Sequence, residues 1–292
     1  MRVRAVSKEN LRDIAGEDWI DHSRRPYAEG NIAWVPVRDD RPCEFELPCR
    51  TRYQGKGFFM LGDVAVIHGK KPTRAEIEEL VSFRHPRGVL WIASLRDITR
   101  TPETEILWGD VGEVRHRENG YTYILDPTKV MFAQGNRIEK MRMAQLVRLK
   151  SSGERVADMF AGIGYFTLPM AGSGASVHAM EINPVACEFL ERNLRENNLS
   201  GRVDISRGDC RHLLNGIYDR IVMGHFDALS ILPAVLSHVR DGSVIHLHSL
   251  SSAENKIKEE VERAGFSATI DVHKVKKYRP HVWHVVQDVT IG

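Results

Sequence analysis

Cysteine is scarce in this chain, and the few residues present lack the spacing of a metal site. The 292 residues include 4 cysteines, and no two of them form the C-x-x-C pair on which many zinc sites depend. The sequence therefore predicts no structural zinc. Cys43 and Cys49 could pair in an oxidising or hyperthermophilic setting, but free thiols are the expected state.

Long apolar runs and a large excess of one charge are also missing. Apolar runs such as Gly88–Leu95 are far shorter than the roughly 20 residues of a membrane-spanning helix. The segment Met1–Lys8 lacks the apolar core of a signal peptide, so we expect a cytoplasmic protein. With 41 basic and 39 acidic residues, the formal net charge is only +2. Any nucleic-acid contact must therefore come from local patches.

The main glycine-rich turn lacks two common phosphate-binding signatures. Phe160–Gly164 reads Phe-Ala-Gly-Ile-Gly, with Thr167 where a dinucleotide fingerprint has its third glycine, and the chain contains no G-K-[S/T] of a P-loop. The turn follows the apolar strand Arg155–Phe160, and the next strand ends in the carboxylate of Glu181. Glycines allow close approach of a ligand, and the acid can accept hydrogen bonds from a ribose. This layout favours S-adenosylmethionine.

Strands and helices alternate through the C-terminal half. This predicts a parallel sheet with helices on both faces, whose last two strands pair antiparallel across a short linker, Lys276–Pro280. The fold class is α/β, a class I methyltransferase-like Rossmann domain plus a small N-terminal α+β domain. The predicted strands are Arg155–Phe160, Ser176–Glu181, Val203–Ser206, Tyr218–Met223, Val244–Leu247, Ser267–Val275 and Val282–Ile291. The predicted helices cover Tyr165–Ala171, Asn183–Asn197, Ser230–Val239 and Ala253–Ala264.

Three regions follow from this pattern. Residues 1–100 are predicted to form the small α+β domain, with a helix near Thr73–Phe83. Residues 101–150 bridge the two domains with a hairpin around Glu118–Tyr121 and the amphipathic segment Arg137–Lys150, and are expected to complete the cofactor site. Residues 151–292 are the predicted S-adenosylmethionine-binding domain. Ligands bind such sheets at the carboxyl ends of the strands, which is where Gly162, Glu181, Asp209 and Gly224 fall.

The segment Ile124–Arg142 is the densest group of charged residues outside the glycine turn. Lys140 could pair with a carboxylate, such as that of the methionine portion of the cofactor, and Arg137 and Arg142 could reach phosphates. By composition alone a solvated helix face explains this segment better.

A resemblance to a known family rests on this segment together with Asp158–Pro169 and Glu181–Pro184. They resemble the enzymes that modify the guanosine-derived base 3′ of the tRNA anticodon. One branch methylates N1 of guanosine and carries Asn-Pro or Leu-Pro after its fourth strand. The other transfers the 3-amino-3-carboxypropyl group of S-adenosylmethionine in wyosine and wybutosine biosynthesis. This chain has Met223-Gly-His-Phe226 there, which resembles the transferase branch, as do Trp19–Tyr27, Trp34–Val37, Gly242–His248 and Val275–His284.

The resemblance implies transfer of that group to C7 of 4-demethylwyosine at position 37 of phenylalanine tRNA, with release of methylthioadenosine. S-adenosylmethionine is then a co-substrate, and residues 1–100 are expected to contact tRNA. The alternative enzyme is a guanosine-37 N1-methyltransferase, which Met223–His225 argues against. An alternative of another class is a non-catalytic tRNA-binding protein that retains the cofactor pocket.

The resemblance also suggests roles for individual residues. Glu181 should hold the ribose, Asp209 and Cys210 should border the adenine, and Ala133, often Ser in the family, and Lys140 should face the methionine portion. The predicted cofactor-binding residues are Ala133, Lys140, Phe160, Ala161, Gly162, Gly164, Glu181, Asp209, Cys210, Met223 and Gly224. Asp126 and His225 are the catalytic candidates, and the predicted RNA-binding residues are Arg137, Arg142, Lys276, Lys277 and Arg279. His246 and His248 lack an evident third ligand, so no metal site is predicted.

Overall fold

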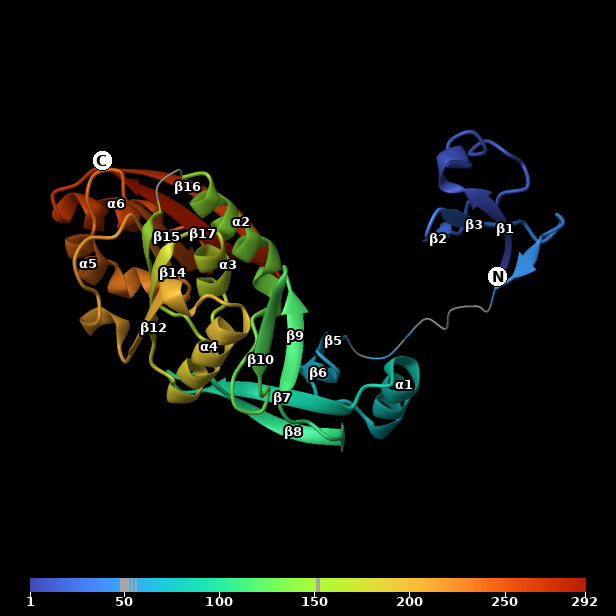
Figure 1. The fold of residues 1–292 in the computed structure, drawn as a ribbon, viewed down its shortest axis with the longest axis horizontal. Helices are drawn as coiled ribbons and strands as arrows, with labels where there is room; N and C mark the ends of the chain where they lie inside the picture. Colours follow the sequence, from blue (N-terminus) through green and yellow to red (C-terminus); the bar gives the residue numbers. More distant parts are fainter. Residues whose placement is uncertain (48–52, 54, 56, 151–152) are drawn as a thin grey trace. The chain divides into compact units, whose positions relative to one another are not determined.

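The structure divides the chain into two compact units (Figure 1). A computed structural model describes residues 1–292 except for 48–52, 54, 56 and 151–152. The first unit spans Met1–Gln54 and the second Gly55–Gly292. The sequence placed the end of the first domain at residue 100 instead. The division falls earlier because Leu61, Val64 and Leu90 share one apolar core with the Rossmann domain.

The first unit is a small four-stranded sheet. Its strands are β1 (Arg2–Ser7), β2 (Tyr27–Glu29), β3 (Ile32–Pro36) and β4 (Phe45–Glu46), in the order β2-β3-β1-β4. Ile20, Ala33 and Val35 form its core. Cys43 is a free thiol, while Cys49, its suggested partner, lies outside the described residues.

The second unit begins with another four-stranded sheet. It contains β5 (Phe58–Leu61), β6 (Val64–His68), β7 (Gly88–Arg96) and β8 (Thr101–Gly109), in that order across the sheet. Helix α1 (Arg74–Arg84) connects the parallel strands β6 and β7, and a reciprocal pair of hydrogen bonds between Thr73 and Glu76 caps it. The sequence did not predict β7 and β8 as strands. Most of β8 stays at least partly exposed, so its sequence lacks a clear apolar alternation.

A hairpin and a helix join this sheet to the Rossmann domain. Strands β9 (Val114–Glu118) and β10 (Tyr121–Leu125) meet at Asn119 and Gly120, both with positive φ, as the Asn-Gly pair predicts. Helix α2 (Arg137–Arg148) follows a short 3-10 turn, Gln134–Asn136. Both elements agree with the sequence-based expectation.

The Rossmann domain contains a seven-stranded sheet in the order β13-β12-β11-β14-β15-β17-β16. Strands β11–β15 pair in parallel, and β17 pairs antiparallel with both of its neighbours, β15 and β16. This is the class I methyltransferase-like arrangement that the alternation predicted. The strands are β11 (Arg155–Asp158), β12 (Ser176–Glu181), β13 (Val203–Arg207), β14 (Arg220–Met223), β15 (Val244–Ser249), β16 (Ala268–Arg279) and β17 (Val282–Ile291).

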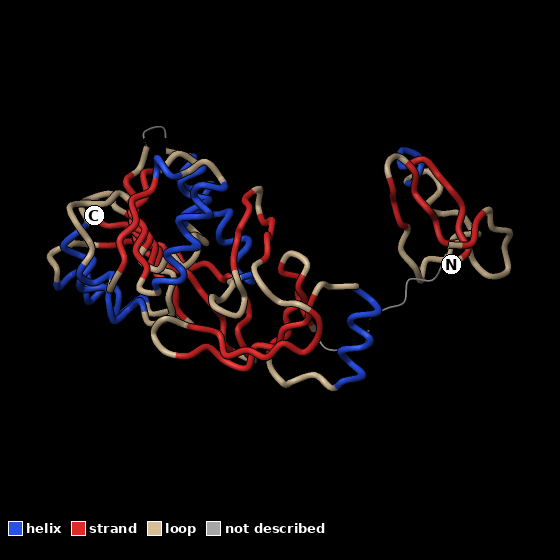
Figure 2. Tube along the Cα trace, turned by 60° about the horizontal axis from the view of Figure 1, so that its bottom comes forward, coloured by secondary structure: helices blue, strands red, loops and turns tan. Residues whose placement is uncertain are grey.

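Helices cover both faces of this sheet (Figure 2). Helices α2, α3 (Thr167–Gly172) and α4 (Pro184–Glu196) contribute to one apolar core, and α5 (Leu232–Val235) and α6 (Glu254–Arg263) contribute to the other. Asn183 caps α4 by accepting hydrogen bonds from the Val185 and Ala186 amides, as predicted. Among the described helices, none is both long and apolar enough to cross a membrane.

Two elements differ from the sequence-based expectation. The predicted helix Ser230–Val239 is one α-helical turn, α5, between two 3-10 turns. Pro233 has no N–H to bond to the Leu229 carbonyl, so the α-helical turn begins only at Leu232. The predicted linker Lys276–Pro280 is mostly strand, since β16 continues to Arg279 with irregular pairing near Val275 and Tyr278. This extension brings Lys276 into the site described next.

Candidate S-adenosylmethionine site

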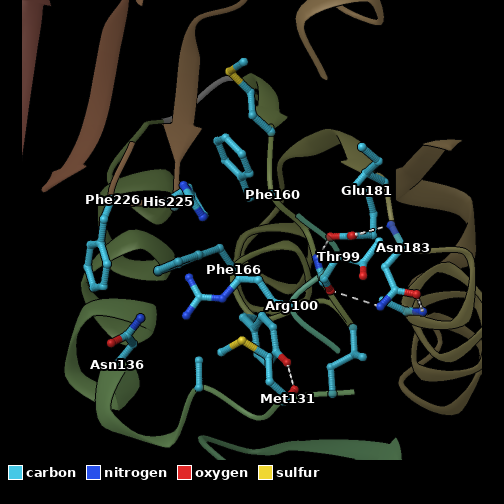
Figure 3. Close-up of a pocket in the computed structure, with 18 of the residues that line it drawn as sticks. Thr99, Arg100, Met131, Asn136, Phe160, Phe166, Glu181, Asn183, His225 and Phe226 are labelled. Atoms are coloured by element: carbon cyan, nitrogen blue, oxygen red, sulfur yellow. Dashed lines mark hydrogen bonds between the residues drawn. The ribbon is translucent and has the colours of Figure 1, made fainter. Parts of the chain in front are cut away.

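A cavity of about 610 Å³ opens at the carboxyl ends of the parallel strands. Its size is that of a small-molecule site. The sequence placed four ligand-binding positions at these strand ends, and the structure brings all four into the cavity wall. The lining residues at or just after the ends of strands β11–β14 include Phe160, Gly162, Glu181, Asp209, Cys210, Gly224 and His225 (Figure 3).

Glu181 and the glycine turn form one hydrogen-bonded unit. The two carboxylate oxygens of Glu181 accept from the Gly162 and Asn183 amides, at 2.8 and 2.7 Å. Burial raises the pKa of Glu181, and these amides oppose that shift. Gly162 has φ +56°, and a Cβ atom there would meet the Tyr165 ring. Each carboxylate oxygen retains a lone pair that can accept from a ribose hydroxyl.

Asp158 supports the segment that follows the glycine turn, through a hydrogen bond with the start of α3. Its buried carboxylate accepts from the Thr167 hydroxyl at 2.7 Å, and its second side-chain oxygen has no partner among the described residues. Burial raises the pKa of Asp158 to about 6. This side chain lies outside the cavity lining and holds the start of α3 against β11.

Asp209 and Cys210 lie together at the end of β13. Hydrogen bonds from the Arg211 side chain and backbone lower the pKa of Asp209 to about 2, so it is ionised at neutral pH. Burial raises the pKa of the Cys210 thiol to about 11. A protonated thiol is a poor nucleophile, which leaves Cys210 as a wall residue beside Asp209.

The Met223–His225 segment divides between core and cavity. Met223 is fully buried in the core beneath the sheet, while Gly224 and His225 line the cavity. The His225 ring stacks on Phe160, with centroids 5.3 Å apart and planes at 25°. His225 Nδ1 accepts from the Asp227 amide, which leaves the proton of the neutral ring on Nε2. Burial and the nearby Arg100 charge lower the pKa of His225.

Lys140 has a different environment from the one predicted. Its Nζ donates to Glu118 at 2.7 Å, and both side chains are buried. The Phe132, Tyr165 and Tyr123 rings surround the ammonium at 4.7–5.6 Å. Burial lowers the pKa of Lys140, and Glu118 opposes that shift. Lys140 therefore joins α2 to the β9–β10 hairpin, and it is not among the cavity-lining residues.

Other predicted site residues also lie outside the cavity lining. Ala161 and Gly164 belong to the packed side of the turn, where a Cβ on Gly164 would meet Leu168. Asp126 closes its own turn by accepting from the Thr128 amide and hydroxyl. Ala133, by contrast, lines the cavity.

The predicted RNA-binding residues separate into three groups. Arg142 is held by Glu139 and Asp288, and Arg137 exchanges hydrogen bonds with Asn119. Lys277 and Arg279 are exposed near the tip of the β16–β17 hairpin. Lys276 instead lines the cavity.

Sequence reasoning missed many of the cavity residues, among them Arg100, Asn136 and His284. Arg100 lies in the turn between β7 and β8, with φ +52°, and the neighbouring Thr99 carbonyl accepts from the Asn183 side chain at 3.2 Å. This turn is far from the glycine loop in sequence, so no local spacing signals it. His284 ends the pattern Tyr-Arg-Pro-His-Val-Trp-His, and nothing in that pattern distinguishes a cavity histidine from a core one.

The two strand histidines of β15 have protein partners. His246 Nδ1 donates to Asp288 at 2.6 Å, because its Nε2 accepts from Arg220. His248 shares a hydrogen bond with His284 at 2.9 Å. Within the described part of the chain, no three His, Cys, Asp or Glu side chains are grouped as metal ligands.

This fold and cavity define the class of S-adenosylmethionine-dependent transferases, and the chain belongs to the family with the TRM5/TYW2 methyltransferase domain, whose model matches residues 114–276. It is similar to the tRNA(Phe) (4-demethylwyosine(37)-C(7)) aminocarboxypropyltransferase of Methanocaldococcus jannaschii, with 34% identity over 78% of this chain and 95% of the relative. The protein of the same name from Pyrococcus horikoshii is 33% identical over 81% of this chain and 89% of the relative.

Solved structures give the same family. The crystal structure of Pyrococcus horikoshii TYW2 in complex with MeSAdo matches with a TM-score of 0.70 and 30% identity, over 81% of this chain and 91% of that one. The crystal structure of Trm5b from Pyrococcus abyssi matches with a TM-score of 0.77 and 25% identity, over 99% of both chains. The Trm5b match thus extends over more of this chain than the TYW2 match does.

Proposed function

We propose that this protein transfers the 3-amino-3-carboxypropyl group of S-adenosylmethionine to C7 of 4-demethylwyosine at position 37 of phenylalanine tRNA. The main support is that two relatives with this printed activity match about four fifths of the chain at 33–34% identity. The cavity adds independent support. Its hydrogen-bonded glycine turn and Glu181 fit an adenosine ribose, and Gly224-His225 lies where a methylating relative needs an amide and a proline.

The reaction forms a bond between C7 and the γ-carbon of the methionine portion and breaks the bond from that carbon to sulfur. C7 loses a proton, and methylthioadenosine leaves. The protein mainly has to orient the two reactants in line. Glu181 holds the ribose and Asp209 borders the adenine, which fixes the sulfur relative to the Phe160–His225 wall.

His225 acts as a hydrogen-bond donor and not as a base in this proposal. Its Nδ1 already accepts from the Asp227 amide at 3.2 Å, so Nε2 carries the proton and can orient a polar edge of the acceptor. The acceptor ring is electron-rich, and loss of its proton to solvent needs no strong base. Asp126, the other sequence-based candidate, is engaged in its own turn.

Isotope labelling distinguishes this function from its alternatives. The protein is incubated with S-adenosylmethionine labelled either in the methyl or in the carboxyl carbon, using tRNA that carries unmodified guanosine or the tricyclic precursor. Only the carboxyl label should enter RNA, and only the precursor tRNA should gain the mass of the aminocarboxypropyl group. Methyl label in the guanosine tRNA would instead establish the N1-methyltransferase. No label in either RNA, with the cofactor still bound, would favour a non-catalytic RNA-binding protein.

A further inference from the structure

The β16–β17 hairpin places a lysine and a histidine side by side at the cavity. Lys276 and His284 are register partners across the two strands, and both line the cavity. The sequence had assigned Lys276, with Lys277 and Arg279, to an RNA-binding linker. The irregular pairing on either side of it, between Lys274 and Lys276 and between Lys277 and Arg279, sets Lys276 apart from its exposed neighbours.

Two cavity cations have no carboxylate partner among the described residues. Lys276 and Arg100 line the cavity, and no described ion pair includes either side chain. Arg100 Nε is also buried without a hydrogen-bond partner in the described part of the chain. The two charges are near enough that Arg100, after burial, lowers the pKa of Lys276. Half-buried cations that repel each other favour an anionic ligand between them.

The acids of the cavity are already engaged. Both carboxylate oxygens of Glu181 accept hydrogen bonds from backbone amides, and Asp209 forms an ion pair with Arg211. Asp227 is mostly exposed and faces His225 at 3.6 Å. None of these carboxylates neutralises Lys276 or Arg100 by a described contact, so both charges are available to an anionic ligand.

His284 is a second, independent sign that a ligand binds in the part of the cavity beside Lys276 and Arg100. The side chain is 1% exposed, its Nε2 is hydrogen-bonded to His248 at 2.9 Å, and its Nδ1 has no partner among the described residues. Burial and the Lys276 charge lower the pKa of His284 to about 4. The ring is therefore neutral at pH 7, with one buried nitrogen left for a polar ligand.

The position of Lys276 indicates which anion it meets. A Cβ atom on Gly135 would meet the Lys276 ammonium, so this charge lies against the Gln134–Asn136 turn next to Ala133. In the view of Figure 3, Arg100 lies between Glu181 on one side and Asn136 and Phe226 on the other. Arg100 thus lies away from the Glu181 carboxylate in this view, and Lys276 lies against the turn that follows Ala133, the residue predicted to face the methionine portion.

We infer that Lys276, together with Arg100, binds the carboxylate of the aminocarboxypropyl group, and that His284 supports this contact from the neighbouring strand. This assignment rests on the proposed function. It replaces Lys140, whose charge is satisfied by Glu118, as the residue that holds the methionine portion. Held at its carboxylate, the transferred group keeps a fixed direction relative to the sulfur, which in-line attack at the γ-carbon requires.

The test compares ligands that differ only at this group. Calorimetry measures the affinities of S-adenosylmethionine and of decarboxylated S-adenosylmethionine for the wild-type protein, Lys276→Met and Lys276→Arg. The wild type should prefer the carboxylate-bearing ligand, and Lys276→Met should reduce that preference by roughly ten- to hundredfold, the range of one charge-assisted hydrogen bond. Lys276→Arg should retain most of it. Methylthioadenosine, which lacks the whole group, should bind all three proteins within about twofold.

Lys274→Met is the matched control, because it removes the same charge from an exposed position on the same strand. It should leave the preference unchanged, and thermal unfolding should show that each variant is folded. An undiminished preference in Lys276→Met would overturn the inference. A Lys276→Met protein that binds tRNA more weakly but still prefers S-adenosylmethionine over its decarboxylated form would also overturn it, because Lys276 would then be a phosphate contact.

Failure of this inference is distinguishable from failure of the proposed function. The binding preference is measured without turnover, whereas the proposed function depends on the group found on RNA. If the wild-type protein transfers the methyl group to RNA, the proposed function is refuted, whichever ligand the protein prefers in the binding assay. An aminocarboxypropyl product with an undiminished preference in Lys276→Met would refute only the role of Lys276.

Discussion

Glu181 builds the site in which we propose that it also binds the ribose. It holds the glycine turn through the Gly162 amide and the start of α4 through the Asn183 amide, so its position is fixed before any ligand arrives. A fixed acceptor avoids the cost of ordering a flexible side chain on binding. The neighbouring residues divide the other tasks, with Asp158 supporting the turn and Asp209 bordering the cavity.

Replacing Glu181 by Gln should weaken S-adenosylmethionine binding by roughly ten- to hundredfold, because a charged acceptor is lost and the new amide opposes one backbone donor. Isothermal calorimetry measures the effect. Glu191→Gln, on the exposed side of α4, is the matched control and should bind normally. If Glu181→Gln binds as the wild type does while remaining folded, the ribose contact lies elsewhere.

At the scale of elements, a buried charge network joins α2 to the sheet. Asp288 on β17 accepts from Arg142 on α2 and from His246 on β15, at 2.5–3.0 Å. Burial opposes ionisation of Asp288, but the His246 and Arg142 hydrogen bonds prevail and lower its pKa. The carboxylate therefore stabilises the fold above its ordinary pKa of about 4, and this contribution is lost as the pH falls toward its lower folded-state pKa.

Asp288→Asn should lower the free energy of unfolding at pH 7 by about 1.5–3 kcal/mol, because the hydrogen bonds then lack a charged acceptor. Chemical denaturation at pH 7 and at decreasing pH measures this, and the difference between the two proteins should shrink in acid. Asp271→Asn removes a carboxylate from the register partner on β16, which is exposed, and should change stability little. A constant difference at all pH values would mean that the ionised carboxylate is not the source.

At the scale of the whole molecule, the cavity belongs to one unit. Its described lining residues all lie between Phe59 and His284, within the unit Gly55–Gly292. The first unit carries its own small core, and Arg24 and Arg25 border a shallow hollow on it. We propose that the first unit contributes to tRNA binding and not to the cofactor site.

A fragment of residues 55–292 should therefore bind S-adenosylmethionine within about threefold of the full chain but bind tRNA more weakly, with a smaller dependence on salt because fewer phosphate contacts release counterions. Calorimetry and filter binding at several salt concentrations measure the two affinities. The full chain assayed in parallel is the control. Equal tRNA affinities would remove the first unit from the RNA interface.

The sequence by itself determined the order of the Rossmann elements and the cofactor turn. Gly162 follows one strand of clear apolar pattern and Glu181 ends the next, so their meeting at one sheet edge follows from parallel topology. The Asn119-Gly120 hairpin and the Asn183-Pro184 helix start were equally readable, because cap and turn chemistry is local.

Only the tertiary structure decided which charge serves the cavity and which serves the fold. Lys140 and Lys276 are both lysines in charged segments, and neither spacing nor composition separates them. The β9–β10 hairpin supplies Glu118 to Lys140, whereas β16 extends beyond its apolar pattern and carries Lys276 to the cavity beside Arg100. Such pairings depend on side chains that are distant in sequence, because burial and charge compensation are fixed only when the packed elements meet.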